Sequence, residues 1–344
     1  MKTEITKLFG IKYPIILPGM SWISVPELVA AVSNAGGLGI LATGPLTREE
    51  TRASIKRIRE LTKKPFGIGC TLLMPGAREN AEIALEEKVP VINISLGKGD
   101  DIMKLCHAYG GKVISTVTTV KHAIAAEKAG ADALQVTGHE AAAHGSMVTS
   151  LVLVPAIKKA VKIPIISIGG YCDGKGLIAA LSLGADGIGM GSRLSVTKES
   201  PVHDLTKKAT IEMTEQDTLY SNRFDGLYCR VLDTKSARKA IRRGMSLPRA
   251  FFASFSGAKQ VGVPWIKLAI GTIMRGPKIM LQLAHFVTSV ALIKYATEDG
   301  DLKKGVHLIG QVQGLIDDIP SVKEVIDRTV KEAQIILSSL SKKI

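Results

Sequence analysis

The sequence is poor in aromatic side chains and in cysteine. Phe, Trp and Tyr make up 4% of its 344 residues, which leaves few rings for stacking on bases, and no nucleic-acid-binding motif is recognisable. The four cysteines have no C-x-x-C spacing and no accompanying histidine pattern, so neither a zinc site nor a disulfide framework is indicated. We therefore expect no nucleic-acid partner, no bound metal and a reducing, cytoplasmic environment.

The sequence also lacks a long uncharged segment. Its first ten residues, MKTEITKLFG, do not contain the apolar stretch of a signal peptide, which argues against export. The longest uncharged run, Ile279–Ile293, has fifteen residues and includes four polar side chains, whereas about 20 apolar residues are needed to cross a bilayer. This run predicts a buried or groove-lining helix, and a weak contact with an anionic membrane surface stays open as an alternative.

Positive charge is abundant and unevenly distributed. The formal net charge is +14, and the segment from Arg223 to Lys278 contains twelve Lys or Arg residues against two acids, Asp225 and Asp233. Such a segment is either a solvated basic face or an electrostatic guide for an anionic substrate, carrier or lipid surface.

Short β-branched segments alternate with helix-like segments in the first part of the chain. Their starts lie about 25 residues apart on average, and 46% of all residues are apolar. This alternation predicts an α/β protein with a parallel sheet, and eight repeats predict a closed (β/α)8 barrel, the TIM-barrel fold. The expected strands are Ile15–Leu17, Leu38–Leu41, Phe66–Cys70, Val91–Ile94, Val113–Val117, Ala133–Val136, Ile165–Ile168 and Gly187–Met190.

The alternation ends after the eighth expected strand, which suggests three parts. Residues 1–215 are expected to form the barrel, residues 216–304 a smaller inserted lid or substrate domain, and residues 305–344 a return to the barrel. Ser200 and Pro201 suit the N-cap and first position of a helix. Ser321 and Glu324 form a capping box before an amphipathic helix that should pack back on the barrel.

Two glycine-rich turns lie at the ends of the last two expected strands. Gly169 and Gly170 follow the seventh strand, and Gly191 and Ser192 follow the eighth. Glycine lets backbone N–H groups approach an anion closely, and these two loops are the usual phosphate site of barrels. The turns therefore predict a phosphate-binding site.

A polar loop, residues 138–145, follows the sixth expected strand. Side chains at the carboxyl end of a barrel strand point into the catalytic mouth, so His144 is a candidate general acid or base. His139 and Glu140 lie nearby, but no third converging metal ligand is evident. After the first strand, the turn Pro18-Gly19-Met20 could lie along a flat ring.

Together these segments resemble the nitronate monooxygenase family, once called 2-nitropropane dioxygenases, and its relative, the FMN-type enoyl-acyl-carrier-protein reductase. The resemblance covers most of residues 10–235 and resumes at residues 310–316. It implies an oxidoreductase with FMN as cofactor and His144 as the acid/base residue. It also implies phosphate contacts from Gly169, Gly170, Gly191 and Ser192, ring contacts from Pro18, Gly19 and Met20, and closure of the cofactor site by Gln311 and Gly314.

Two departures from the family pattern bear on the cofactor site. Ala142 and Ala143 stand where the family usually has glycines, and alanine would be strained if those positions need a positive φ. Cys70 ends the third strand where the family usually has asparagine, and we count Cys70 among the expected cofactor contacts.

The resemblance leaves more than one reaction open. The first expectation is oxidation of nitronates or nitroalkanes, small molecules, with O2. The alternative is a reductase that takes electrons from NAD(P)H and passes them to a quinone or to an enoyl thioester of an acyl carrier or coenzyme A, and the basic, apolar insert favours the thioester version. A third reading is a barrel that binds a phosphorylated ligand or a lipid surface without turnover. A homodimer is compatible with each.

Overall fold

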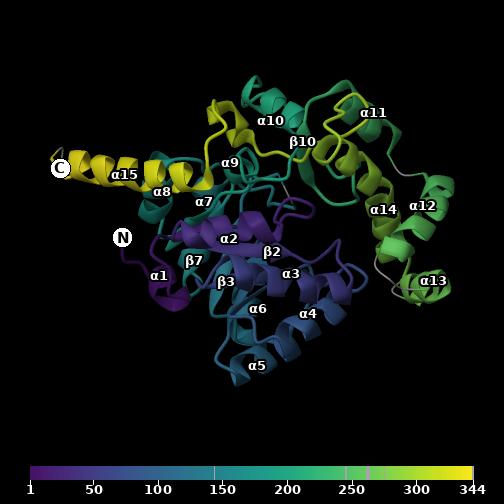
Figure 1. The fold of residues 1–344 in the computed structure, drawn as a ribbon, viewed down its shortest axis with the longest axis horizontal. Coiled ribbons are helices and arrows are strands. Elements are labelled where there is room, and N and C mark those ends of the chain that lie inside the picture. The colour runs from purple at the N-terminus through teal and green to yellow at the C-terminus, as the bar shows by residue number, and fades with distance from the viewer. Residues whose placement is uncertain (143, 245, 261–263, 275, 343–344) are drawn as a thin grey trace.

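The computed structural model describes residues 1–344 except 143, 245, 261–263, 275 and 343–344. Eight parallel strands form a closed barrel, in which β1 pairs with both β2 and β8 (Figure 1). The predicted TIM barrel is thus confirmed, and each expected strand overlaps an observed one. The strands are β1 (Ile15–Leu17), β2 (Leu38–Ala42), β3 (Phe66–Thr71), β4 (Val91–Ser95), β5 (Lys112–Val117), β6 (Ala133–Thr137), β7 (Ile165–Ile168) and β8 (Gly187–Gly189).

Helices accompany the barrel: α1 precedes β1, and each of α2 to α8 connects two consecutive strands. Several begin at a side-chain cap, such as Thr47 before α3, where Thr47 and Glu50 form a capping box. These helices are α1 (Glu4–Phe9), α2 (Pro26–Asn34), α3 (Arg48–Leu61), α4 (Ala77–Glu86), α5 (Asp100–Ala108), α6 (Val120–Ala129), α7 (Ser150–Lys158) and α8 (Gly174–Ser182).

Two apolar layers hold the barrel together. Inward-facing residues such as Ile16, Ile40 and Ile166 fill its interior, and Ile5 and Phe9 of α1 pack against this cluster. A larger cluster fills the space between the strands and the outer helices. Because both faces of each strand are buried, the strands read as continuous apolar runs in the sequence.

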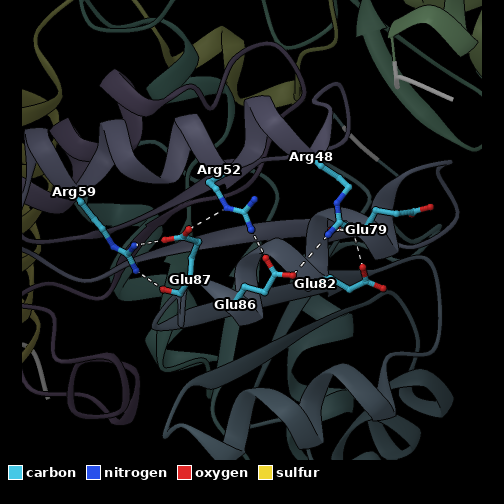
Figure 2. Close-up of polar contacts among 7 residues, drawn as sticks. All are labelled: Arg48, Arg52, Arg59, Glu79, Glu82, Glu86 and Glu87. Atoms are coloured by element: carbon cyan, nitrogen blue, oxygen red, sulfur yellow. Dashed lines mark hydrogen bonds and ion pairs between the residues drawn. The ribbon is translucent and has the colours of Figure 1, made fainter.

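On the outer surface, α3 and α4 are linked by a row of ion pairs (Figure 2). Arg48 lies 2.7 Å from Glu82, and Arg59 lies 2.7 Å from Glu87. Arg52 lies between them and contacts Glu86 and Glu87, as Figure 2 shows. Because these side chains other than Glu87 are substantially exposed, most of the pairs add little to stability.

After β8, the chain forms α9 (Ser192–Ser195) and α10 (Asp204–Ile211). The helix predicted to begin at Ser200-Pro201 begins later, with His203 as its N-cap. The reason is local: Ser200 Oγ accepts the N–H of Val202 in a turn, whereas His203 Nδ1 accepts the N–H of Leu205 at the helix start.

The strand–helix rhythm then gives way to a hairpin and a group of helices with their own small core, which includes Phe224, Val231 and Ile293. The elements are β9 (Thr218–Ser221), β10 (Cys229–Leu232), α11 (Lys235–Arg243), α12 (Leu247–Gln260), α13 (Trp265–Met274) and α14 (Pro277–Thr297).

The end of the chain returns to the barrel through a 3₁₀ turn, η1 (Gln311–Leu315), and a last helix, α15 (Val322–Leu340). Ser321 and Glu324 form the predicted capping box, with Glu324 Oε2 2.7 Å from Ser321 N. As predicted, α15 packs on the barrel: it lies against α8, where a Cβ at Gly174 would be 2.4 Å from Ala333 N.

Candidate active site

A cavity of about 1340 Å³ opens at the carboxyl ends of the barrel strands. It extends beyond them, between the barrel mouth and helices α12 to α14. Parallel barrels carry their active sites at this end, because the loops after all the strands converge there. Of the residues predicted from the sequence, those that line the cavity are Pro18, Gly19, Met20, His144, Gly169, Gly170, Gly191 and Ser192.

The two glycine turns form one concave wall of the cavity. Gly169 and Gly170 have φ values of +117° and +84°, which side chains with a Cβ rarely adopt. A Cβ at Gly169 would lie 3.2 Å from Ala141 N, and one at Gly191 would lie 3.3 Å from Met20 Sδ. Gly191 is also the N-cap of α9, whose N–H groups are not capped by a side chain. The wall is therefore shaped for an anion held by backbone donors.

Glu140 and Ser150 hold the first of these turns in place. The Glu140 carboxylate accepts the N–H of Ser150 at 3.0 Å, and Ser150 Oγ lies 3.0 Å from Glu140 Oε2 and 3.2 Å from the carbonyl oxygen of Gly169. Glu140 thus joins the loop after β6 to the loop after β7. Among the described residues no group of three or more His, Cys, Asp and Glu is placed to hold a metal ion.

The turn after β1 is held by one buried hydroxyl. Ser24 Oγ donates to the carbonyl oxygen of Pro18 at 2.7 Å and accepts the N–H of Met20 at 3.0 Å. A Cβ at Gly19 would lie 3.5 Å from the carbonyl oxygen of Leu41, so the turn rests closely on the barrel. Its outer side borders the cavity, where a flat ring could lie along it.

A polar chain inside the barrel mouth was missed by the sequence reasoning. Gln135 Nε2 donates to Thr116 Oγ1 at 3.2 Å, and Asn93 Nδ2 donates to the same oxygen at 3.1 Å. Gln135 Oε1 is buried, has no hydrogen-bond partner among the described residues, and belongs to a residue that lines the cavity. An unpaired buried acceptor calls for a donor. A polar residue within each of three apolar strands was the pattern that could have revealed this chain.

These features fit a flavin nucleotide. The glycine wall can bind a phosphate, the Pro18–Met20 turn can support a flat ring, and Gln135 Oε1 can accept a hydrogen bond from an N–H group of that ring.

His144 lies at the cavity wall and is hydrogen-bonded to the buried carboxylate of Asp225. Its Nε2 is 2.9 Å from Asp225 Oδ2, and the two side chains are 25% and 3% exposed. Asp225 Oδ1 accepts the N–H of Leu227 at 3.0 Å, which fixes the carboxylate. With Nε2 bonded to Asp225, Nδ1 of His144 is left to exchange a proton with a molecule in the cavity. From the sequence, Asp225 was identified only as one of the two acids in a basic segment and not as the partner of His144.

The alanine at position 142 is not strained. Among the described non-glycine residues, a positive φ occurs at Trp22, Lys88 and Leu96 and not at Ala142. Ala142 lines the cavity, and its carbonyl oxygen accepts the N–H of Arg230 at 2.7 Å. Its neighbour Ala143 lies outside the described residues.

Three expected cofactor contacts do not line the cavity. Cys70 is fully buried in the layer between the strands and the outer helices, where burial raises the pKa of its thiol to about 12. Strand alternation explains this, because Cys70 faces outward with Ile68 and Phe66.

Gly314 packs against Glu215, and Gln311 lies between two lining residues, Gly310 and Val312. Gln311 reaches the site only through its N–H, which donates to the carbonyl oxygen of Glu140 at 3.0 Å.

The part of the cavity that lies beyond the strand ends, next to α14, has an apolar wall. Helix α14 contributes Met280, Leu283, Phe286, Val287 and Val290 to its wall, which confirms the prediction of a groove-lining helix in this segment. By length and composition alone, Ile279–Thr297 is also apolar enough to cross a membrane, with a mean hydropathy of 1.4. Since many of its apolar side chains face the cavity, that composition has an explanation within the fold. Helices α12 and α13 complete the wall with Phe251, Trp265, Ala269, Thr272 and Ile273.

His307 is a buried histidine at the cavity wall. Both of its ring nitrogens lack a hydrogen-bond partner in the described part of the chain, and burial lowers its pKa to about 4. The imidazole is therefore neutral in the folded protein at neutral pH.

This shift predicts acid sensitivity. The pKa of His307 in the folded state lies below its unfolded value of about 6.5. The folded protein therefore suffers no penalty from protonation of His307 above about pH 6.5, and it loses stability as the pH falls toward 4. We expect the free energy of unfolding to drop by about 3 kcal/mol over this range from His307 alone, with burial of His285 acting in the same direction. Urea unfolding of wild type and His307→Gln at pH 7 and pH 4 measures the difference. The exposed His122→Gln should behave as wild type, and equal pH dependence in wild type and His307→Gln would contradict the assignment.

Comparison with known proteins finds the same family along nearly the whole chain. The family model described as "Nitronate monooxygenase" matches residues 2–86 and 76–332. A relative from Rhodococcus jostii (strain RHA1), named (3aS,4S,5R,7aS)-5-hydroxy-7a-methyl-1-oxo-octahydro-1H-indene-4-carboxyl-CoA dehydrogenase, is 34% identical over 340 residues, covering 97% of this chain and 96% of the relative.

Two further proteins are similar to this chain, one compared by sequence and one by structure. A probable nitronate monooxygenase of Staphylococcus aureus (strain Newman) is 31% identical over 280 residues, covering 68% of this chain and 79% of the relative. The structure of FabK from Thermotoga maritima superposes with a TM-score of 0.82 at 33% identity, covering 100% of both chains.

Proposed function

The chain belongs to the nitronate monooxygenase family, and on that basis we propose that it is an FMN-dependent oxidoreductase of carrier-bound acyl thioesters with a bulky apolar acyl group. Family membership makes it a flavin-dependent oxidoreductase. FMN in particular, the thioester substrate and the cytoplasmic location are the proposed parts.

The size and lining of the cavity carry the proposal. The cavity of about 1340 Å³ would have to hold both the flavin at the strand ends and the substrate, and the wall that α12 to α14 contribute beyond the strand ends is apolar. A small nitroalkane would leave most of that apolar surface uncovered. A long or polycyclic acyl group extending from the barrel mouth toward α14 would cover it.

The basic helix α11 supports an anionic carrier such as coenzyme A or an acyl carrier protein. It follows β10, next to the loop in which Asp225, Leu227 and Tyr228 line the cavity. Its buried face is made of small apolar residues, Ala237 and Ala240. Five exposed cations at helical spacing form its other face: Lys235, Arg238, Lys239, Arg242 and Arg243. Such a row of cations attracts molecules that carry phosphates or carboxylates and increases the rate at which they associate with the protein.

His144 and Asp225 account for the proton transfer. When bound, FMN supplies reversible two-electron chemistry at the strand ends. His144 Nδ1 would take a proton from the acyl carbon next to the thioester carbonyl in the oxidative direction, or return it in the reductive direction. The Asp225 carboxylate stabilises the imidazolium that forms and holds the ring through Nε2. Thr116 and Gln135, which are hydrogen-bonded to each other, make the cavity wall polar at the strand ends.

Oxidation of a nitronate or nitroalkane with O2 is the second candidate, and it was the first expectation from the sequence. The Staphylococcus aureus relative favours it, and the same His144 nitrogen could take the acidic α-proton of a nitroalkane. In the reductive direction of the thioester reaction, NAD(P)H would be the electron donor to the flavin.

Anaerobic mixing of the FMN-loaded protein with each substrate class tests the proposal. The chemically reduced protein should be reoxidised by decenoyl-coenzyme A, and its second-order rate should exceed that with butenoyl-coenzyme A by more than about a hundredfold. The reason is that each buried methylene contributes about 0.8 kcal/mol. Separate arms with NADH, NADPH and a small alkyl nitronate identify the electron donor. Turnover of the nitronate without any response to either thioester would overturn the proposal in favour of the second candidate.

A further inference from the structure

Helix α13 is apolar on two opposite faces. Trp265, Ala269 and Thr272 face the cavity. Ile266, Ile270 and Met274 do not line it, and they are 67%, 54% and 82% exposed. A helix that is apolar all round is normally buried on all sides. The outer face of α13 therefore has an apolar surface that the folded chain leaves uncovered.

Helix α12 extends this surface. Phe252 is 72% exposed and does not line the cavity, while its neighbour Phe251 is half exposed and does. Phe255 stacks on Trp265 with ring centroids 4.5 Å apart, which joins the two helices. In a chain with few aromatics, three of the seven Phe residues and one of the two Trp residues lie here. Figure 1 shows α12 and α13 at one end of the molecule, beyond α14 and away from the barrel helices.

The charge around this surface has one sign. From Thr234 to Thr297 the sequence has eleven Lys or Arg residues and no Asp or Glu. On the two helices themselves, Arg249, Lys259 and Lys267 are exposed. Exposed apolar and aromatic side chains surrounded by cations are typical of segments that lie in the headgroup region of an anionic membrane.

The cavity reaches the same surface. Phe251 and Ile273 both line the cavity and have about half or more of their surface exposed. The wall of the cavity and the exposed surface of α12 and α13 therefore share these side chains.

We propose that α12 and α13 rest on an anionic lipid surface, with Phe252, Ile266, Ile270 and Met274 inserted among the lipids. A second copy of the chain is a poorer occupant, because an isologous contact through these helices would place the same cations against each other without a single acid from residues 234–297. The lipid contact rests on the exposed surface and holds whichever acyl substrate the cavity takes.

Co-sedimentation of the full-length flavoprotein with vesicles tests this docking. Wild type should bind vesicles of phosphatidylcholine containing phosphatidylglycerol, and should not bind phosphatidylcholine alone. The triple variant Phe252→Ser/Ile270→Ser/Met274→Ser should lose this binding. The variant Arg249→Gln/Lys259→Gln/Lys267→Gln should bind about a hundredfold more weakly, because each of the three cations near the surface contributes about fivefold.

The matched control lies at the opposite end of the molecule in Figure 1, on α15. Ile335→Ser/Leu337→Ser/Leu340→Ser removes three exposed apolar side chains and should bind vesicles as wild type does. Light scattering should give one oligomeric state for all these proteins. Absence of binding to the anionic vesicles, equal binding by the α12–α13 variants, or a change of oligomeric state in place of lost lipid binding would each overturn the proposal.

Discussion

Replacing His144 by Asn should lower turnover by about 10²–10⁴-fold while the fold and the bound flavin are kept. The side chain is only partly exposed, lies at the cavity wall and is held by Asp225 at 2.9 Å. Asparagine is similar in size but cannot carry a proton. Anaerobic kinetics of each half-reaction measure the loss: reduction of the flavin by a nicotinamide donor should be spared, and the step that moves a proton at the acyl carbon should slow.

His139 provides the matched control for this substitution. It belongs to the same loop, does not line the cavity, and packs edge-on against Tyr220 with ring centroids 4.4 Å apart. His139→Asn should therefore keep turnover close to that of wild type. Wild-type rates in every half-reaction of His144→Asn would reduce His144 to a structural residue.

Asp225 acts through His144, and its role can be separated from a merely structural one. Asp225→Asn should slow the step that moves a proton at the acyl carbon, because the imidazolium that forms on His144 loses the carboxylate that stabilises it, while reduction of the flavin by a nicotinamide donor should be unchanged. The double variant should be hardly worse than His144→Asn alone, because the two residues work as a unit. A proton-transfer step as fast in Asp225→Asn as in wild type would argue against this coupling.

The second large effect is expected at Gly170. Valine there should weaken FMN binding, because its branched side chain would project into the concave wall between the loops after β6 and β7. Overpacking costs about 1–3 kcal/mol, which corresponds to about 5–150-fold in Kd, and the positive φ adds further strain. Flavin absorbance relative to protein in the purified variant, followed by titration with FMN, measures the loss.

A second glycine separates the loss of flavin from backbone strain. Gly110 has a φ of +85°, close to the +84° of Gly170, and a Cβ at Gly110 would meet nothing within 4 Å. Gly110→Val should lose a similar amount of stability and keep its flavin. Gly191→Val tests the other half of the wall without this strain, since Gly191 has a φ of −80°. Full flavin occupancy in both Gly170→Val and Gly191→Val would show that the phosphate lies elsewhere.

The proposed lipid contact and the proposed substrate class are compatible. Carrier-bound acyl groups have an anionic end and an apolar end, and the molecule offers the cation face of α11 and the apolar wall of α12 to α14 on one side of the barrel mouth. Their tests use different readouts, vesicle binding and flavin kinetics, so each can fail without the other.

The sequence by itself determined the features that depend on neighbouring residues. β-Branched runs located all eight strands, and the glycines of Gly169-Gly170 and Gly191 located the cavity wall. The capping box of Ser321 and Glu324 located the start of α15. Each is encoded within a few positions, because strand propensity, positive φ and helix capping are properties of short segments.

Tertiary structure alone decided which distant side chains meet. Asp225 reaches His144 across 81 positions of sequence, and Gln135 Oε1 is buried without a partner in the described part of the chain because the barrel closes around it. Cys70 faces the outer helices, since a strand presents alternate residues to opposite sides and the register that assigns the sides is set by its neighbours. The continuity of the cavity with α12 and α13 likewise depends on how the insert folds back over the mouth. Such contacts are fixed by packing over long separations, which no local pattern encodes.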